Sequence, residues 1–150
     1  MAYIEERAEV AAPIGVVFDL ISDYRRALTW MDGFTRFDLL PGPERGVGAR
    51  VLAAGSILGF TITTELEVVE FERPYRFVSQ STRPIRSETT WSLGASDQGT
   101  WIRYSGTYDL PLAMRLVGEG AITQIVTAQI RRSLENLQRL LGDAKQVPET

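Results

Sequence analysis

The chain has 150 residues, 44% of them hydrophobic, and a formal net charge of −3, which is the composition of a one-domain globular protein. It contains no histidine and no cysteine. Ser-His and Cys-His catalysis, thiolate chemistry, disulfides and the usual zinc, copper and haem ligand sets are therefore excluded.

Neither the charge nor the apolar segments favour a nucleic acid or a bilayer as partner. The arginines are scattered along the chain, and the longest apolar stretch, around residues 51–60, is too short to span a membrane. We expect a cytoplasmic protein that needs no cofactor, binds no nucleic acid and does not integrate into a membrane.

The first predicted element is a strand over residues 3–10, with Ile4, Ala8 and Val10 on one face. The apolar residues of 12–22 recur at helical spacing, and Pro13 suits the first turn of a helix. A second short helix is predicted over 23–31, with Asp23 as its N-cap.

The hydrophobic period then changes to two. Strands are predicted over residues 34–40, 49–59, 60–72 and 75–81, with the facing of the last one left open, and a hairpin follows over 87–110. About seven strands result. "GVGARV" at 46–51 precedes a strand and lacks the third glycine of a dinucleotide fingerprint, so it is predicted to be a turn.

One face of the 87–110 hairpin has an unusual composition. Alternation places on it Thr89, Trp91, Leu93, Ile102, Tyr104, Gly106, Tyr108 and Leu110. Two phenols, a threonine and a glycine stand where an ordinary core would hold valine and leucine. From spacing alone, the tyrosines either pack with satisfied hydroxyls or face a cavity.

A long helix is predicted to end the fold. One apolar stripe contains Leu112, Leu116, Ile122, Val126, Ile130, Leu134, Leu137 and Leu141. Gly118 and Gly120 are expected to bend or interrupt its beginning, in a segment that could serve as a hinge or present N–H groups to an anion, and Gly142 to end it. Residues 143–150 are predicted to be a disordered tail, which leaves 1–142 as the domain.

The segments "APIGVVFDLISDYRRALTWM", "PGPERGVGARV", "VVEFERPYRFVSQS", "TWSLGASDQGTWIRY" and "TYDLP" stand in this order before the long helix. Together they resemble the START-like, or SRPBCC, superfamily, in its polyketide cyclase/dehydrase and lipid-transport branch. The resemblance implies an α+β helix-grip fold. In that fold a curved antiparallel sheet of about seven strands wraps around the C-terminal helix, with two short helices after the first strand and an apolar cavity inside.

The resemblance also implies a set of cavity-lining residues that bind a hydrophobic small molecule. Aromatic and aliphatic side chains would supply contact area, hydroxyls would orient polar groups, and Gly106 would leave space. The predicted ligand-binding residues are Trp30, Phe37, Phe60, Ile62, Thr64, Phe77, Thr89, Trp91, Tyr104, Tyr108, Ile122, Val126 and Ile130.

No residue is firmly assigned a catalytic role. Tyr104 and Tyr108 are conditional candidates, with Glu6 or Arg86 as an acid–base partner. Glu6 falls on the inward face of the first strand, where it is either a carboxylate in an apolar cavity or the partner of an arginine. Trp30, Met31 and Phe34 are either a gate at the cavity mouth or a hydrophobic anchor for the short helices.

Three functions fit these observations. The favoured hypothesis is a carrier or sensor of a lipid, isoprenoid or polyketide-like molecule, acting as a monomer or weak homodimer. The second is a metal-free polyketide aromatase/cyclase of the lyase or dehydratase type. The third is an interaction protein, as in START-like branches associated with ribosomes or respiratory quinone, for which Trp101 and Arg103 on the outer face are the only indication.

Overall fold

The computed structural model describes residues 1–142. The residues predicted to be a disordered tail, 143–150, lie outside this range. The elements are β1 (Ala2–Val10), α1 (Ile14–Ile21), η1 (Tyr24–Thr29), β2 (Phe34–Leu39), β3 (Arg50–Ile57), β4 (Phe60–Glu72), β5 (Arg76–Ser81), β6 (Arg86–Ser96), β7 (Gly99–Asp109), α2 (Leu112–Val117) and α3 (Glu119–Leu141).

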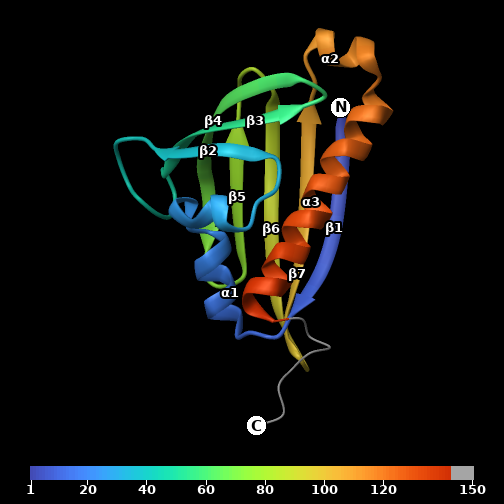
Figure 1. The fold of residues 1–150 in the computed structure, drawn as a ribbon. Coiled ribbons are helices and arrows are strands. Elements are labelled where there is room, and N and C mark those ends of the chain that lie inside the picture. The colour runs from blue at the N-terminus through green and yellow to red at the C-terminus, as the bar shows by residue number, and fades with distance from the viewer. Residues whose placement is uncertain (143–150) are drawn as a thin grey trace.

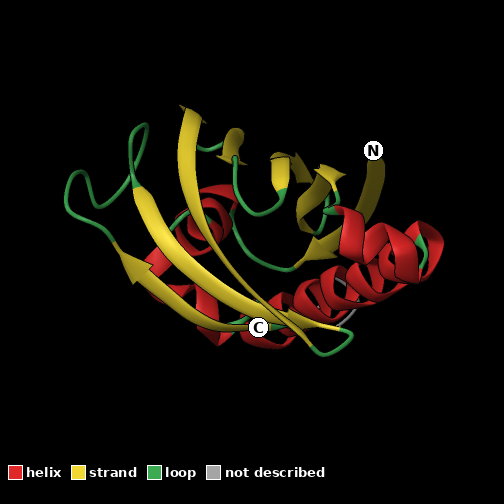
Figure 2. Ribbon diagram, turned by 90° about the horizontal axis from the view of Figure 1, so that it is seen from above, coloured by secondary structure: helices red, strands yellow, loops and turns green. Residues whose placement is uncertain are grey.

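The seven strands form one antiparallel sheet in the order β1-β7-β6-β5-β4-β3-β2. The sheet curves around α3, which lies diagonally across its concave face (Figures 1 and 2). The register shifts between Phe34 and Arg36 in β2 and between Val68 and Glu70 in β4, as at β-bulges. The helix-grip prediction is confirmed.

The facing predicted for the strands is also found. The inward face of β4 carries Phe60, Ile62, Thr64, Leu66 and Val68, and the burial pattern of β4 alternates accordingly. On β5, whose facing was left open, Phe77, Ser79 and Ser81 are buried on the inward side. They pair with Trp91, Thr89 and Ser87 of β6.

Two short helices follow β1, and each packs into a buried cluster of its own. Val17, Phe18, Leu20 and Ile21 of α1 are buried in one cluster with Leu134 and Leu137 of α3 and with inward residues of β6 and β7. Asp23 accepts a hydrogen bond from the Arg25 backbone N–H at 3.1 Å, which confirms it as an N-cap. The element it caps is a six-residue 3₁₀ helix.

Gly118 separates α2 from α3, whereas Gly120 lies within α3. The backbone of Gly118 has φ +119°, so α2 turns away from the axis of α3. The prediction of one continuous apolar stripe is therefore wrong in α2, where Leu112 is 66% and Leu116 80% exposed. At the other end of α3, Gly142 is the C-cap, and its carbonyl accepts a hydrogen bond from the Ala11 N–H at 2.8 Å.

Within residues 1–142, no helix combines the length and the apolar character that a bilayer span needs.

Candidate functional site

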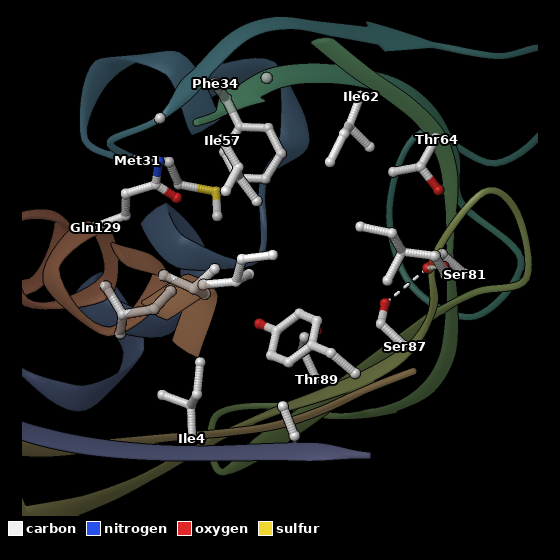
Figure 3. Close-up of a pocket in the computed structure, with 18 of the residues that line it drawn as sticks. Ile4, Met31, Phe34, Ile57, Ile62, Thr64, Ser81, Ser87, Thr89 and Gln129 are labelled. Carbon is white, nitrogen blue, oxygen red and sulfur yellow. Dashed lines mark hydrogen bonds between the residues drawn. The ribbon is translucent and has the colours of Figure 1, made fainter. Parts of the chain in front are cut away.

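A cavity of about 150 Å³ lies between the sheet and the first half of α3 (Figure 3). Its wall is mainly apolar. Ile4 and Thr89 stand on one side, and Phe34, Ile57 and Ile62 face them from the other. The lining residues are Ala2, Ile4, Met31, Asp32, Gly33, Phe34, Gly55, Ser56, Ile57, Ile62, Thr64, Leu66, Ser81, Ile85, Ser87, Thr89, Trp91, Tyr104, Tyr108, Leu110, Ile122, Thr123, Val126, Gln129 and Ile130.

The two cavity tyrosines meet across a glycine. Tyr104 and Tyr108 lie four residues apart on the inward face of β7, and their hydroxyl groups form a hydrogen bond with each other. A Cβ atom on Gly106, between them, would lie 2.9 Å from Tyr104 Oη and 3.0 Å from Tyr108 Oη. Thr89 of β6 pairs directly with Gly106 and lines the same wall. The hydroxyl groups of Tyr104, Tyr108 and Thr89 therefore surround Gly106, which has no side chain.

Both phenols remain neutral at neutral pH. Burial raises the pKa of Tyr108 to about 12, and burial together with the neighbouring Tyr108 raises the pKa of Tyr104 well above its usual value. The pair is therefore a source of O–H donors and not of a phenolate.

The wall hydroxyls of Ser81, Ser87 and Thr64 are satisfied by the protein. The hydroxyls of Ser81 and Ser87 are hydrogen-bonded at 2.6 Å, and Ser81 donates to the Ile85 carbonyl at 2.7 Å. Thr64 Oγ1 donates to the Arg83 carbonyl at 2.8 Å. These bonds hold the loop between β5 and β6 against the cavity wall.

Among the described residues that line the cavity, Asp32 alone is charged, and none is an arginine or a lysine. The Asp32 carboxylate accepts a hydrogen bond from Arg132 Nε at 2.8 Å, and its backbone N–H donates to Ser133 Oγ at 2.8 Å. Within residues 1–142, no cluster of three or more Asp and Glu side chains is arranged to hold a metal ion.

The structure brings nine of the thirteen predicted ligand-binding residues to the cavity wall. They are Ile62, Thr64, Thr89, Trp91, Tyr104, Tyr108, Ile122, Val126 and Ile130. That these side chains contact a ligand remains a prediction, which the geometry makes testable.

The other four predicted residues are not among the lining residues. Trp30 stands edge-on to Trp91 with ring centroids 5.3 Å apart, and Phe77 is stacked with Trp91 at 6.4 Å. Phe37 belongs to a second core cluster with Tyr24 and Val51. Phe60 packs against the cluster of Ile85, Leu110, Met114 and Ile122. These aromatic side chains support the wall from behind.

Glu6 and Arg86, the conditional acid–base partners, do not line the cavity. Arg131 Nε of α3 donates to Glu6 Oε1 at 3.0 Å, so Glu6 takes the ion-pair alternative. Arg86 is exposed. Of the three residues weighed as gate or anchor, Met31 and Phe34 line the cavity, whereas Trp30 is buried in the core.

Several lining residues were missed by sequence reasoning. Ser81 and Ser87 follow from the period-two pattern through Phe77 and Trp91, once the facing of β5 is known. Ile57, Gly55 and Ser56 lie near the end of β3, and Gln129 Nε2 donates to the Ser56 carbonyl at 3.3 Å. No local pattern in the sequence predicts this last contact, since it depends on where the hairpin of β3 and β4 meets α3.

Trp101 lies on the outer face of the sheet, as predicted, and is 40% exposed. Its ring covers Gly94 of β6, where any Cβ would clash with it. Arg103, also on the outer face, is hydrogen-bonded to Glu5 of β1. Both residues therefore have partners within the sheet.

A seven-stranded antiparallel sheet curved around a C-terminal helix, with an apolar cavity between them, defines the START-like helix-grip class of proteins. Residues 1–142 match the family model for polyketide cyclase/dehydrase and lipid transport, and the chain belongs to this family. No curated protein sequence matches the chain.

Solved structures share the fold at low sequence identity. The protein TTHA0849 from Thermus thermophilus superposes with a TM-score of 0.75 at 16% identity, over 93% of this chain and 99% of that one. The KanY protein gives a TM-score of 0.77 at 13% identity, over 94% and 99% of the two chains. The di-domain ARO/CYC BexL from the BE-7585A biosynthetic pathway gives 0.68 at 20% identity, over 93% of this chain and 50% of that one.

Proposed function

We propose that the protein binds a hydrophobic small molecule in the cavity between the sheet and α3, and carries it without changing it chemically. The observation that carries this proposal is the cavity itself, which has a mainly apolar wall with a few hydroxyl groups. Such a composition is typical of ligand pockets, in which apolar contacts supply affinity and a few polar groups set orientation.

Apolar burial is sufficient to hold such a ligand. A molecule that buries about 300 Å² of apolar surface gains roughly 7 kcal/mol at about 25 cal/mol per Å². Part of this gain is lost to the entropy of association, so micromolar or weaker binding is the expected range without any charged contact.

The arrangement of titratable groups favours carriage over catalysis. A general acid–base mechanism needs two groups within reach of one substrate, with pKa values suited to proton transfer near neutral pH. Here the phenols are bonded to each other, Glu6 is paired with Arg131, and Asp32 is paired with Arg132.

A second candidate, a polyketide aromatase/cyclase, is supported by the tyrosine pair. A neutral phenol can stabilise negative charge that develops on a carbonyl oxygen during an aldol-type ring closure, and the cavity can hold the chain folded. The fold neighbour BexL is a di-domain ARO/CYC protein, which makes this reaction the natural alternative.

Native mass spectrometry of freshly purified protein, followed by denaturation of the same sample, tests the proposal. A discrete extra mass that is lost on denaturation supports the carrier. The released compound is then incubated with fresh apo-protein. Recovery of the compound unchanged confirms carriage, whereas a product that has lost water establishes the cyclase. A protein that shows no extra mass and binds no apolar compound in titration overturns both.

A further inference from the structure

The tyrosine pair in the cavity wall has one more hydroxyl proton than its own hydrogen bond uses. Tyr104 and Tyr108 each have one phenol proton, and the hydrogen bond between them uses only one of the two. Neither hydroxyl has another side-chain or backbone partner within residues 1–142. One phenol O–H therefore remains a donor without a protein acceptor, in the wall of the cavity.

The hydroxyls of Ser81, Ser87 and Thr64 have no such surplus. Because Ser81 donates its proton to the Ile85 carbonyl, Ser87 must be the donor in the bond between the two serines. The proton of Thr64 is likewise taken by the Arg83 carbonyl. Free donor capacity thus remains at the tyrosine pair and at the adjacent Thr89, whose hydroxyl has no hydrogen-bond partner in the described chain. Two further lining hydroxyls lack a partner there, those of Ser56, which is exposed, and Thr123, which is half-buried, but only the tyrosine pair offers a phenol donor.

A buried donor without an acceptor is unfavourable, and an acceptor oxygen on the ligand removes that penalty. An anionic oxygen does not fit equally well, because burying a charge requires a compensating opposite charge. No cationic side chain from the described residues lines the cavity, and the one charged lining residue among them, Asp32, is itself an anion. Gly106 keeps the space between the phenols free of any side chain.

We infer that the ligand is an uncharged molecule whose apolar body carries a hydrogen-bond-accepting oxygen of the ketone, quinone, ester or ether type, and that the Tyr104–Tyr108 pair donates to this oxygen. Tyr104 and Tyr108 are then the residues that determine specificity among apolar molecules of similar size. This inference rests on the proposed function, since it concerns the occupant of the same cavity.

Three naphthalene probes of similar shape test the inference by equilibrium dialysis. They are 2-acetylnaphthalene, which is a ketone, 2-isopropenylnaphthalene, which is its hydrocarbon isostere, and 2-naphthoate, which is the carboxylate. We expect the double variant Tyr104→Phe/Tyr108→Phe to bind the ketone five- to tenfold more weakly than the wild type does. Its affinity for the hydrocarbon should change by less than twofold. The wild-type protein should bind the naphthoate at least tenfold more weakly than the ketone.

Tyr75→Phe is the matched control, since it removes a phenol hydroxyl that is exposed and does not line the cavity. It should leave the affinity for the ketone within twofold. A second measurement uses only the wild-type protein, so it tests the inference even if the double variant does not fold. In the wild-type complex, the infrared stretching frequency of a ¹³C-labelled ketone carbonyl should lie below its frequency in hexane, as a hydrogen bond from a phenol requires.

The outcomes separate the two proposals. Equal losses for ketone and hydrocarbon, an unshifted carbonyl frequency, or a naphthoate bound as tightly as the ketone each overturn the inference and leave the binding function standing. A wild-type protein that binds none of the three probes contradicts the proposed function as well as the inference.

Discussion

The two halves of α3 face the same sheet, but the space between helix and sheet is packed along one half and hollow along the other. We call these the filled end and the open end. Around Leu134 and Leu137 the space is filled by a cluster of buried side chains. Around Ile122 and Val126 the same two layers enclose the cavity. The buried residues of α1 fill the first region, whereas in the second α2 contributes Met114 to a smaller cluster with Ile85, Leu110 and Ile122, and the cavity remains (Figure 1).

The sheet prepares this difference through the sizes of its inward side chains. At the filled end, Leu93 and Ile102 face α1 and α3, and Phe18 is fully buried with its ring edge-on to Phe71 and Phe77. Toward the cavity the corresponding inward pairs of β6 and β7 are Thr89 with Gly106 and Ser87 with Tyr108, of which only Tyr108 is large. Side chains therefore do not fill the interior completely at the open end, and a cavity results.

The same substitution at the two ends should give the largest contrast. We expect Phe18→Ala to lower the free energy of unfolding by about 3–5 kcal/mol, because it leaves a void in a packed region. Phe34→Ala, in the cavity wall, should cost about 1–2 kcal/mol, because a half-buried ring beside an existing cavity loses fewer contacts. Urea unfolding measures both, and equal losses would show that the two ends are packed alike.

Alkaline pH should test whether the open end excludes bulk water. The raised pKa values of Tyr104 and Tyr108 mean that the unfolded chain loses these protons first, near pH 10. The unfolded state then binds fewer protons, so the free energy of unfolding should fall as pH rises from 10 to 12, by at most about 1.4 kcal/mol per pH unit for each group.

Urea unfolding at several pH values between 9 and 12 measures this slope. The double variant Tyr104→Phe/Tyr108→Phe should have a shallower slope than the wild type, and Tyr75→Phe, which removes an exposed hydroxyl between β4 and β5, is the control. Equal slopes in the wild type and the double variant would mean that water reaches the phenols.

Adding one methyl group at Gly106, in the cavity wall, should change stability least of the variants considered, but it should lower the affinity for the ketone probe. We expect Gly106→Ala to push the two phenols apart, given the distances of 2.9 and 3.0 Å from its Cβ to their oxygens. The affinity for 2-acetylnaphthalene should fall about three- to fivefold, roughly the net value of one hydrogen bond, with stability changed by less than about 1 kcal/mol. Gly120→Ala, whose Cβ meets no atom of the described chain within 4 Å, is the control and should leave the affinity unchanged.

The sequence was informative where local rules decide the structure. Alternation assigned Tyr104, Gly106 and Tyr108 to one inward face, since successive side chains of a strand must point to opposite sides. The N-cap at Asp23 and the helix end at Gly142 follow from equally local requirements of the backbone.

Sequence reasoning was weaker where the position of a distant element decides. Phe77 and Trp91 are paired residues on the inward face, yet only Trp91 lines the cavity, since Phe18 of α1 packs against Phe77. The exposure of Leu112 and Leu116 likewise depends on the direction that the chain takes at Gly118. Neither outcome is encoded in a short periodic pattern.

The aromatic side chains around Trp91 give the protein a built-in optical reporter. Trp91 lines the cavity, and its ring is nearly perpendicular to that of Trp30, with centroids 5.3 Å apart. Two indoles at this separation are close enough for their electronic transitions to couple. Their near-ultraviolet circular dichroism should therefore change when a ligand displaces one ring by a few degrees. The third tryptophan, Trp101, lies on the outer face and supplies an internal reference for unlabelled titrations.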